Sequence, residues 1–420
     1  MTPGDAPALP TKDDIERVFR AESGRAVSTL IRIFGDIDLA EDAVQDAFLL
    51  AQTAWLEGGL PPNPCGWILT TGSNRAIDWI RRESLGRSLI IDRAKDNPQA
   101  AEYRDENLDP SDDDQLRLIF TCCHPALSME AQVGLTLRLI CGLQTPEIAR
   151  ALLVTEAALA QRLVRAKRKI KDARIPYRVP HDRELPARQA PVLAVIYLVY
   201  NAGTEAPPGP AAGGAQMRNE GIRLARLMAA LLPDQPEVIG LLALLLLNES
   251  RRSACFDGAG AQVLLRDQDR QLWSRSKIQE GQQLLRTCME RNEPGPYQIQ
   301  AAIQAVHADA GSFQDTDWPQ IVSLYDELLR RTASPVVALN RAIALGEVEG
   351  AGAALAIVES LSLPGYCFSH ATRGDLLEKL GRFDEASAAF RQAAELAPTE
   401  AVRGVLLGCA GQADRLGRPG

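Results

Sequence analysis

The chain has 420 residues, of which 46% are hydrophobic and 24% charged, a balance typical of a protein that folds throughout rather than a disordered one. One ordinary hydrophobic core does not extend over such a length, so we expect about two to four domains. The net charge of −8 argues against a wholesale coat of nucleic acid around the protein, but it leaves room for a local basic face.

The cysteines and the apolar runs indicate the compartment. Eight cysteines without a CxxC pair are too sparse for a disulfide scaffold, so reduced thiols are expected. The longest apolar runs, 192–200 and 239–247, are shorter than the roughly 18 residues that suggest a membrane span. No basic-then-apolar signal pattern opens the chain. These features predict a cytoplasmic protein without membrane contact.

Helical periodicity dominates the sequence and predicts an all-α fold. Residues 1–12 contain Pro and Gly and are expected to be disordered. A first unit at 13–91 follows, with helical patterns at 15–34, 39–56 and 66–82 separated by turns. Residues 92–114 are polar, with seven acids against one Arg from 102 onward, and are predicted to form an acidic linker.

A second unit, 115–175, contains the pattern of a helix-turn-helix. Thr145 is the expected capping hydroxyl of the first helix, and Thr155 caps the second after a turn at 153–154. The apolar residues expected on the second helix are Leu159, Leu163 and Val164. Residues 155–174 hold seven Lys or Arg against two acids, and this local excess of positive charge favours DNA. The alternative is a solvated basic helix without a nucleic-acid role.

Two segments of the first unit carry polar and aromatic side chains that suit macromolecular partners. Residues 38–48 begin a helix whose acids lie over adjacent turns, which suits a basic partner, unless the acids only stabilise the positive end of their own helix. Residues 64–82 combine aromatic and Arg side chains, and unstacked bases can lie on aromatic faces while Arg holds the phosphates. The alternative for Trp67 and Trp79 is core packing, which we favour for Trp79 because isoleucines flank it.

These segments, in this order, resemble an extracytoplasmic-function (ECF, group 4) sigma factor, with sigma region 2 at 13–91 and region 4, the helix-turn-helix, at 115–175. The resemblance implies binding to the β′ clamp helices of core RNA polymerase through Asp38, Glu41, Asp42, Gln45 and Asp46. It implies reading of the minus-10 promoter element through Trp67, Asn74, Asp78, Arg81 and Arg82. It also implies reading of the minus-35 element, near the polymerase β flap, through Thr155, Glu156, Ala157, Gln161, Arg162, Arg165, Lys167 and Arg168.

The remainder, 176–420, is predicted to be a helical extension with tetratricopeptide (TPR)-like repeats, clearest at 367–398, with a more degenerate copy around 342–361. In the clearest copy, the packing residues follow at spacings of 12, 4, 3 and 5: Gly374, Ala386, Phe390, Ala393 and Pro398. The extension resembles that of one ECF subgroup, on segments 160–167, 267–270, 295–303 and 339–342. Genes of that subgroup neighbour YCII-related (DGPF) proteins, which implies regulation through the extension and a YCII-related protein or another regulator as a partner.

Other patterns are set aside. Cys122, Cys123 and His124 look like a metal site, but adjacent cysteines chelate zinc poorly and no second ligand pair exists, so a buried position at a helix end is preferred. Residues 267–270 are expected to form a loop held by local salt bridges. No nucleotide-binding or hydrolase fingerprint is present, so neither catalysis nor a cofactor or metal is expected. The resemblance to sigma factors implies an initiation factor that recognises and melts promoters. The rival interpretations are a helix-turn-helix regulator with a TPR sensor and a TPR scaffold with a vestigial DNA-binding head.

Overall fold

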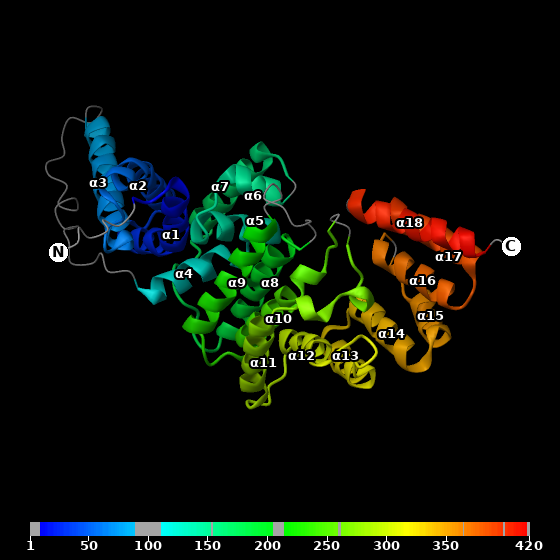
Figure 1. Ribbon diagram of the computed structural model, residues 1–420. Helices are drawn as coiled ribbons and strands as arrows, with labels where there is room; N and C mark the ends of the chain where they lie inside the picture. The colour runs from blue at the N-terminus through cyan, green and yellow to red at the C-terminus, as the bar shows by residue number, and fades with distance from the viewer. Residues whose placement is uncertain are drawn as a thin grey trace, which may run out of the picture. The chain divides into compact units, whose positions relative to one another are not determined.

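The computed structural model describes residues 9–88, 111–152, 154–204, 214–258, 262–363, 365–397 and 400–417 (Figure 1). Within these ranges the regular structure is helical, apart from one isolated bridge between Phe256 and Gln262, which confirms the predicted all-α fold. The chain divides into two compact units, 1–203 with 216–220 and 204–215 with 221–420. The residues predicted to bind polymerase or DNA therefore belong to the first unit, and the predicted repeats belong to the second.

The first unit begins with three helices that pack on one another, α1 (Lys12–Phe34), α2 (Ile37–Gly58) and α3 (Pro64–Ser88). Thr11 and Asp14 form a capping box at the start of α1, so the helix begins inside the segment expected to be disordered, of which residues 1–8 lie outside the described ranges. Gly35, with φ 69°, ends α1 in the left-handed conformation, and the Asp36 carboxylate caps α2. The largest fully buried side chains of this bundle are Ile15, Phe19, Leu30, Trp55, Ile68 and Leu69.

The rest of the first unit consists of short helices and one π-helical turn. In chain order they are α4 (Asp112–Cys122), α5 (Met129–Leu135), the π turn η2 (Thr136–Ile140), α6 (Thr145–Ala151), α7 (Glu156–Asp172) and α8 (Leu185–Asn201). Residues 112–114, predicted as the end of the acidic linker, are helical because the Ser111 hydroxyl caps α4. The linker residues 92–110 lie outside the described ranges. Between α7 and α8 the chain is not helical, as the prolines at 176 and 180 predict.

Helices α6 and α7 are the two helices of the predicted helix-turn-helix. The Thr155 hydroxyl accepts a hydrogen bond from the Ala158 N–H at 3.2 Å and caps α7 as predicted. The cap of α6 is Gln144 rather than Thr145, because the Gln144 N–H donates to the Glu147 carboxylate at 2.8 Å and starts the helix one residue earlier. Leu159 and Leu163 are buried, whereas Val164 is 65% exposed because it lies beside their face rather than on it. The turn residue Leu153 lies outside the described ranges.

The second unit is a succession of helices. They are α9 (Gly214–Leu231), of which 216–220 group with the first unit, α10 (Pro236–Ser250), α11 (Arg275–Met289), α12 (Pro296–Asp309), α13 (Trp318–Thr332), α14 (Pro335–Glu349), α15 (Ala351–Ser360), α16 (Cys367–Lys379), α17 (Phe383–Glu395) and α18 (Glu400–Leu416). Helix α10 is apolar and almost wholly buried, and it packs against both α11 and α12 (Figure 1).

The segment between α10 and α11 contains no α-helix in its described residues but three short 3-10 turns, η3 (Arg252–Ala254), η4 (Leu265–Asp267) and η5 (Arg270–Leu272). The predicted loop at 267–270 joins η4 to η5. Arg270 fixes it by donating to the carbonyl oxygens of His307 and Ala310, the latter at 2.8 Å, and to the Thr316 hydroxyl at 3.2 Å. Neutral acceptors therefore hold Arg270, where the sequence suggested local salt bridges. A short-range pair does exist beside it, between Arg266 and Asp267 at 3.8 Å.

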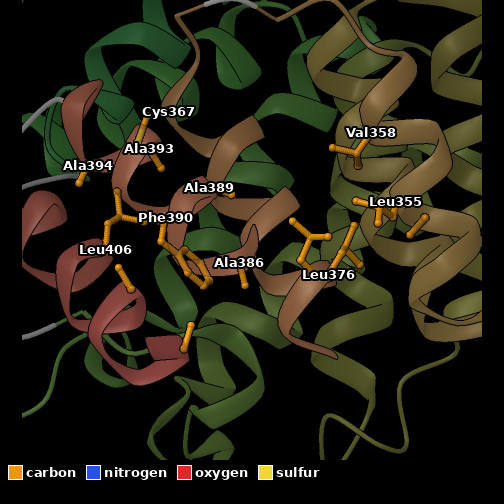
Figure 2. Packing of buried hydrophobic residues seen from close by; sticks show 14 of the residues in the cluster. Leu355, Val358, Cys367, Leu376, Ala386, Ala389, Phe390, Ala393, Ala394 and Leu406 are labelled. Carbon is orange, nitrogen blue, oxygen red and sulfur yellow. The ribbon is translucent and has the colours of Figure 1, made fainter. Parts of the chain in front are cut away.

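The predicted repeat corresponds to the hairpin of α16 and α17 (Figure 2). A Cβ built on Gly374 would lie 2.8 Å from the ring of Phe390, so only glycine allows the Phe390 ring to lie this close to α16. Ala386 and Ala393 are fully buried on the same helix as Phe390, whereas Pro398 lies outside the described ranges. The cluster continues into α15 and α18 through Leu355, Val358 and Leu406. Neighbouring hairpins thus share one core, as repeat proteins require.

Candidate nucleic-acid interface

Helix α7 presents a basic face on the surface of the first unit. Four of its apolar residues, Leu159, Leu163, Ala166 and Ile170, are buried and hold one face of the helix against the unit. Of the predicted minus-35 residues, six are exposed: Thr155, Glu156, Ala157, Gln161, Arg165 and Arg168. Arg162 is half-buried at a groove of about 450 Å³ between α5 and α7, which Arg165 and Lys169 also line. The first turns of α7 are thus open to a ligand, and the cationic side chains beside them suit phosphates.

Helix α3 carries a second polar face. Asn74, Asp78, Arg81 and Arg82 are all exposed, and Arg81 lies 3.8 Å from Asp78. Trp79 is 57% exposed, so the interpretation of this residue as core is wrong: the α1–α3 bundle buries Ala76 on this stretch and leaves the indole outside. An indole beside arginines is a surface on which an unpaired base can stack. Trp67 is half-buried instead, and the centroid of its ring lies 5.2 Å from the ring centroid of Trp55.

The acidic residues of α2 divide into an open and a closed group. Asp42 and Asp46 are exposed and Gln45 is half-buried. Glu41 is only 6% exposed, and it pairs with Arg138 of η2 at 2.5 Å and with Lys167 of α7 at 2.6 Å. Lys167 also pairs with Asp38, at 2.7 Å. A residue predicted to bind polymerase and one predicted to bind DNA are therefore joined to each other.

The charges in this cluster are mutually stabilised. Burial favours the neutral form of Glu41, but the charges of Lys167 and Arg138 outweigh it and hold the pKa of Glu41 below its usual value. Burial likewise opposes the charge on Lys167, yet Glu41 and Asp38 raise its pKa. The pKa of Asp42 is raised, because its carboxylate loses part of its hydration and lies beside the negative charge of Glu41. Glu41 and Lys167 therefore stay ionised near neutral pH.

Arg138 is not among the residues predicted from the sequence. It lies in an apolar run, between Leu137 and Leu139, which are both fully buried. A single Arg in such a run signals a buried ion pair or hydrogen-bonded site, because an unpaired buried charge is costly. Its guanidinium also donates to the Leu143 carbonyl at 3.2 Å and to the Gln144 side chain at 2.9 Å. The signal was present, but the partner could not be read from the sequence.

The cysteine pair at the end of α4 lies where the sequence placed it. Cys122 and Cys123 are buried, and Cys123 caps the helix C-terminus. Burial raises the pKa of both thiols, that of Cys123 to about 12, so both stay protonated. Among the residues that the structure describes, no three side chains of His, Cys, Asp or Glu gather in a way that could hold a metal ion.

Comparison with known proteins gives the chain a family. It is 45% identical over 386 residues to uncharacterized protein R00370 of Rhizobium meliloti (strain 1021), and the alignment covers 89% of each protein. The chain belongs to the family of R00370. Residues 188–289 of the present chain match the family of unknown function DUF6596, and its residues 367–400 match the tetratricopeptide repeat. The second match confirms the repeat predicted at 367–398.

A second similarity covers a smaller part of the chain. Over 167 residues it is 30% identical to "Probable ECF RNA polymerase sigma factor SigI" of Mycobacterium tuberculosis, in strains CDC 1551 / Oshkosh and ATCC 25618 / H37Rv. The aligned part is 39% of this chain and 56% of the sigma factor. Partial similarity to an ECF sigma factor is thus present. Among the described helices, none is both long and apolar enough to span a lipid bilayer.

Proposed function

We propose that this protein is a sigma factor, which binds core RNA polymerase, recognises the minus-10 and minus-35 promoter elements and opens the promoter without catalysing a reaction. The observation that carries the proposal is the exposed face of α3, where Trp79 lies among Asn74, Asp78, Arg81 and Arg82. Stacking of an unpaired base on an exposed indole, with arginines for the backbone, is the chemistry that capture of melted DNA needs.

Two further features of the first unit support the proposal. The N-terminal turns of α7 are exposed, and the cations that begin at Arg162 follow them on the same helix, an arrangement that suits the major groove of duplex DNA. Asp42 and Asp46 are exposed on α2, which suits a basic protein surface. A regulator that binds DNA without polymerase needs neither the acidic helix nor an exposed base-stacking residue. The partial similarity to SigI agrees with this assignment.

The second unit is proposed to regulate the first. TPR-type helical hairpins stack into surfaces that bind proteins, and residues 367–400 match such a repeat. By the resemblance stated for the sequence, a YCII-related protein or another regulator is the proposed partner. The domains proposed for the chain are a region-2 bundle, a linker, a region-4 helix-turn-helix and this extension.

Run-off transcription tests the proposed function. Purified core polymerase and the intact chain, with the upstream region of the protein's own gene as template, should give a defined transcript. Asp46→Arg should lower its yield about tenfold or more, because a cation would then face the basic surface of the polymerase. Asp46 is exposed, so the fold should tolerate the change. Glu57→Arg is the matched control, since Glu57 is an exposed acid in the last turn of the same helix and no partner is proposed for it.

Two results would contradict the proposal. Equal transcription by the Asp46→Arg and unsubstituted chains would remove α2 from the polymerase contact. No transcript from any chain, with duplex DNA still bound by the protein alone, would favour the helix-turn-helix regulator.

A further inference from the structure

We propose that the first unit is closed by an intramolecular latch, in which η2 and α7 cover part of the acidic face of α2, and that the latch must open before this face can bind a basic protein. The latch is defined by Asp38 and Glu41 on one side and Arg138 and Lys167 on the other. The inference rests on the proposed function and concerns the regulation of its polymerase-binding face.

The ion pairs of the latch withhold one residue of each of two predicted binding sites. Glu41 lies 2.5 Å from Arg138 and 2.6 Å from Lys167, and it is 6% exposed. Its carboxylate therefore cannot reach a partner while both cations remain in place. The side chain of Lys167 is only 15% exposed, so the same contact withholds this cation from a DNA phosphate. Closure therefore removes Glu41 from the acidic face and Lys167 from the basic face at the same time.

The latch rests on an unusually close approach of two backbones. A Cβ built on Gly24 of α1 would lie 2.6 Å from the carbonyl oxygen of Ile140, at the end of η2. Two residues later, Gly142 has φ +67°, and a Cβ there would lie 2.9 Å from the Cβ of Ser23. Gly24 and Gly142 thus let η2 lie directly on α1 beside the ion pairs. Any side chain at Gly24 would act as a wedge, because backbone atoms cannot rotate away.

Polar contacts join the same two parts of the unit outside the latch. Arg20 of α1 pairs with Glu147 of α6 at 2.8 Å, and Arg32 pairs with the fully buried Asp114 of α4 at 2.8 Å. The Tyr177 hydroxyl donates to the carbonyl oxygen of Ser28 at 2.7 Å. Interfaces rich in such contacts can exchange partners, and a basic protein surface can replace Arg138 and Lys167 around the acids of α2. Opening therefore exchanges one set of ion pairs for another.

The test compares the affinity of full-length variants for purified core RNA polymerase. Gly24→Ala introduces the wedge, and Arg138→Gln removes one cation without touching a residue proposed to bind polymerase or DNA. Both should bind core polymerase about fivefold or more tightly than the unsubstituted chain, because a modest loss of closed-state stability shifts the population toward the open state. Gly58→Ala is the control, since a Cβ there meets no atom within 4 Å. Amide hydrogen exchange across residues 136–142 reports opening independently of binding.

The outcomes separate the latch from the function on which it rests. If the unsubstituted chain supports transcription while neither variant binds more tightly, although exchange at 136–142 is faster, the latch does not gate binding and the inference is wrong. Weaker binding by both folded variants would also overturn it, since the closed form would then be the binding form. If Gly24→Ala does not fold, Arg138→Gln decides. If no chain binds polymerase or gives a transcript, the proposed function fails and the latch fails with it.

Discussion

A single buried histidine shows how the second unit responds to acid. His307 of α12 is 7% exposed, and the centroid of its ring lies 5.4 Å from the ring centroid of Trp318. Burial lowers the pKa of His307 to about 4, and the positive charges of Arg251 and Arg270 act in the same direction. His307 therefore has to be neutral in the folded protein.

This requirement predicts an acid-dependent loss of stability. Between its ordinary pKa of 6.5 and about 4, His307 takes up a proton in the unfolded chain but not in the folded one. The free energy of unfolding should thus be fully retained above pH 6.5 and fall by up to about 3 kcal/mol as the pH drops toward 4. Urea unfolding at about pH 7 and about pH 5, followed by circular dichroism, measures the change. His307→Gln has no proton to take up, so its stability should vary less, and an equal variation would assign the effect to other groups.

At the scale of elements, the α16–α17 hairpin depends on one small-to-large contact. The Gly374–Phe390 contact leaves no space for a methyl group, so Gly374→Ala should destabilise the protein by about 1–3 kcal/mol through overpacking. Phe390→Ala should cost about 3–5 kcal/mol, because it leaves a cavity in a core whose members are at most a few per cent exposed. Urea unfolding of the full chain measures both changes.

A glycine in the next helix provides the control for the hairpin. A Cβ at Gly404 of α18 meets no atom within 4 Å, so Gly404→Ala should be neutral or stabilise the helix by up to about 1 kcal/mol. A loss of stability at Gly404 as large as at Gly374 would show that helix propensity, not the contact with Phe390, decides the effect.

The start of α7 and the repeat could be predicted because their signals are local. Thr155 caps α7 through a hydrogen bond to Ala158, three residues away, and the residues of the TPR pattern lie within one hairpin. The latch could not be predicted, since Arg138 and Glu41 are 97 residues apart in the chain and no periodicity links them. Trp79 was misjudged for a related reason. Its isoleucine neighbours predict a buried position, but the indole lies on the outer face of α3, which only the packing of the three helices reveals.

At the scale of the whole molecule, the unit boundary differs from the break in helical pattern. The prolines at 176 and 180 follow the end of α7, and the extension was predicted to begin at 176. The structure groups α8 with the first unit, where it packs on α4 and α5. Arg188 of α8 also donates to the Phe120 carbonyl at 2.7 Å. A proline-rich break therefore predicts a change of element, whereas a domain boundary depends on contacts made afterwards.

This grouping predicts how truncation affects the first unit. A chain ending at 180 should be far less stable than one ending at 220, because it loses α8, whose buried apolar residues are Val192, Leu193, Val195, Ile196, Val199 and Tyr200. Each fully buried aliphatic side chain contributes about 1.5–3 kcal/mol, so the loss exceeds the stability of most domains. Soluble yield and thermal unfolding of the two truncated chains measure the difference. Equal stability would assign α8 to the second unit.

Loss of transcription on truncation at 180 would therefore reflect unfolding of the first unit. Only a fragment that retains α8 can reveal whether the second unit regulates the first.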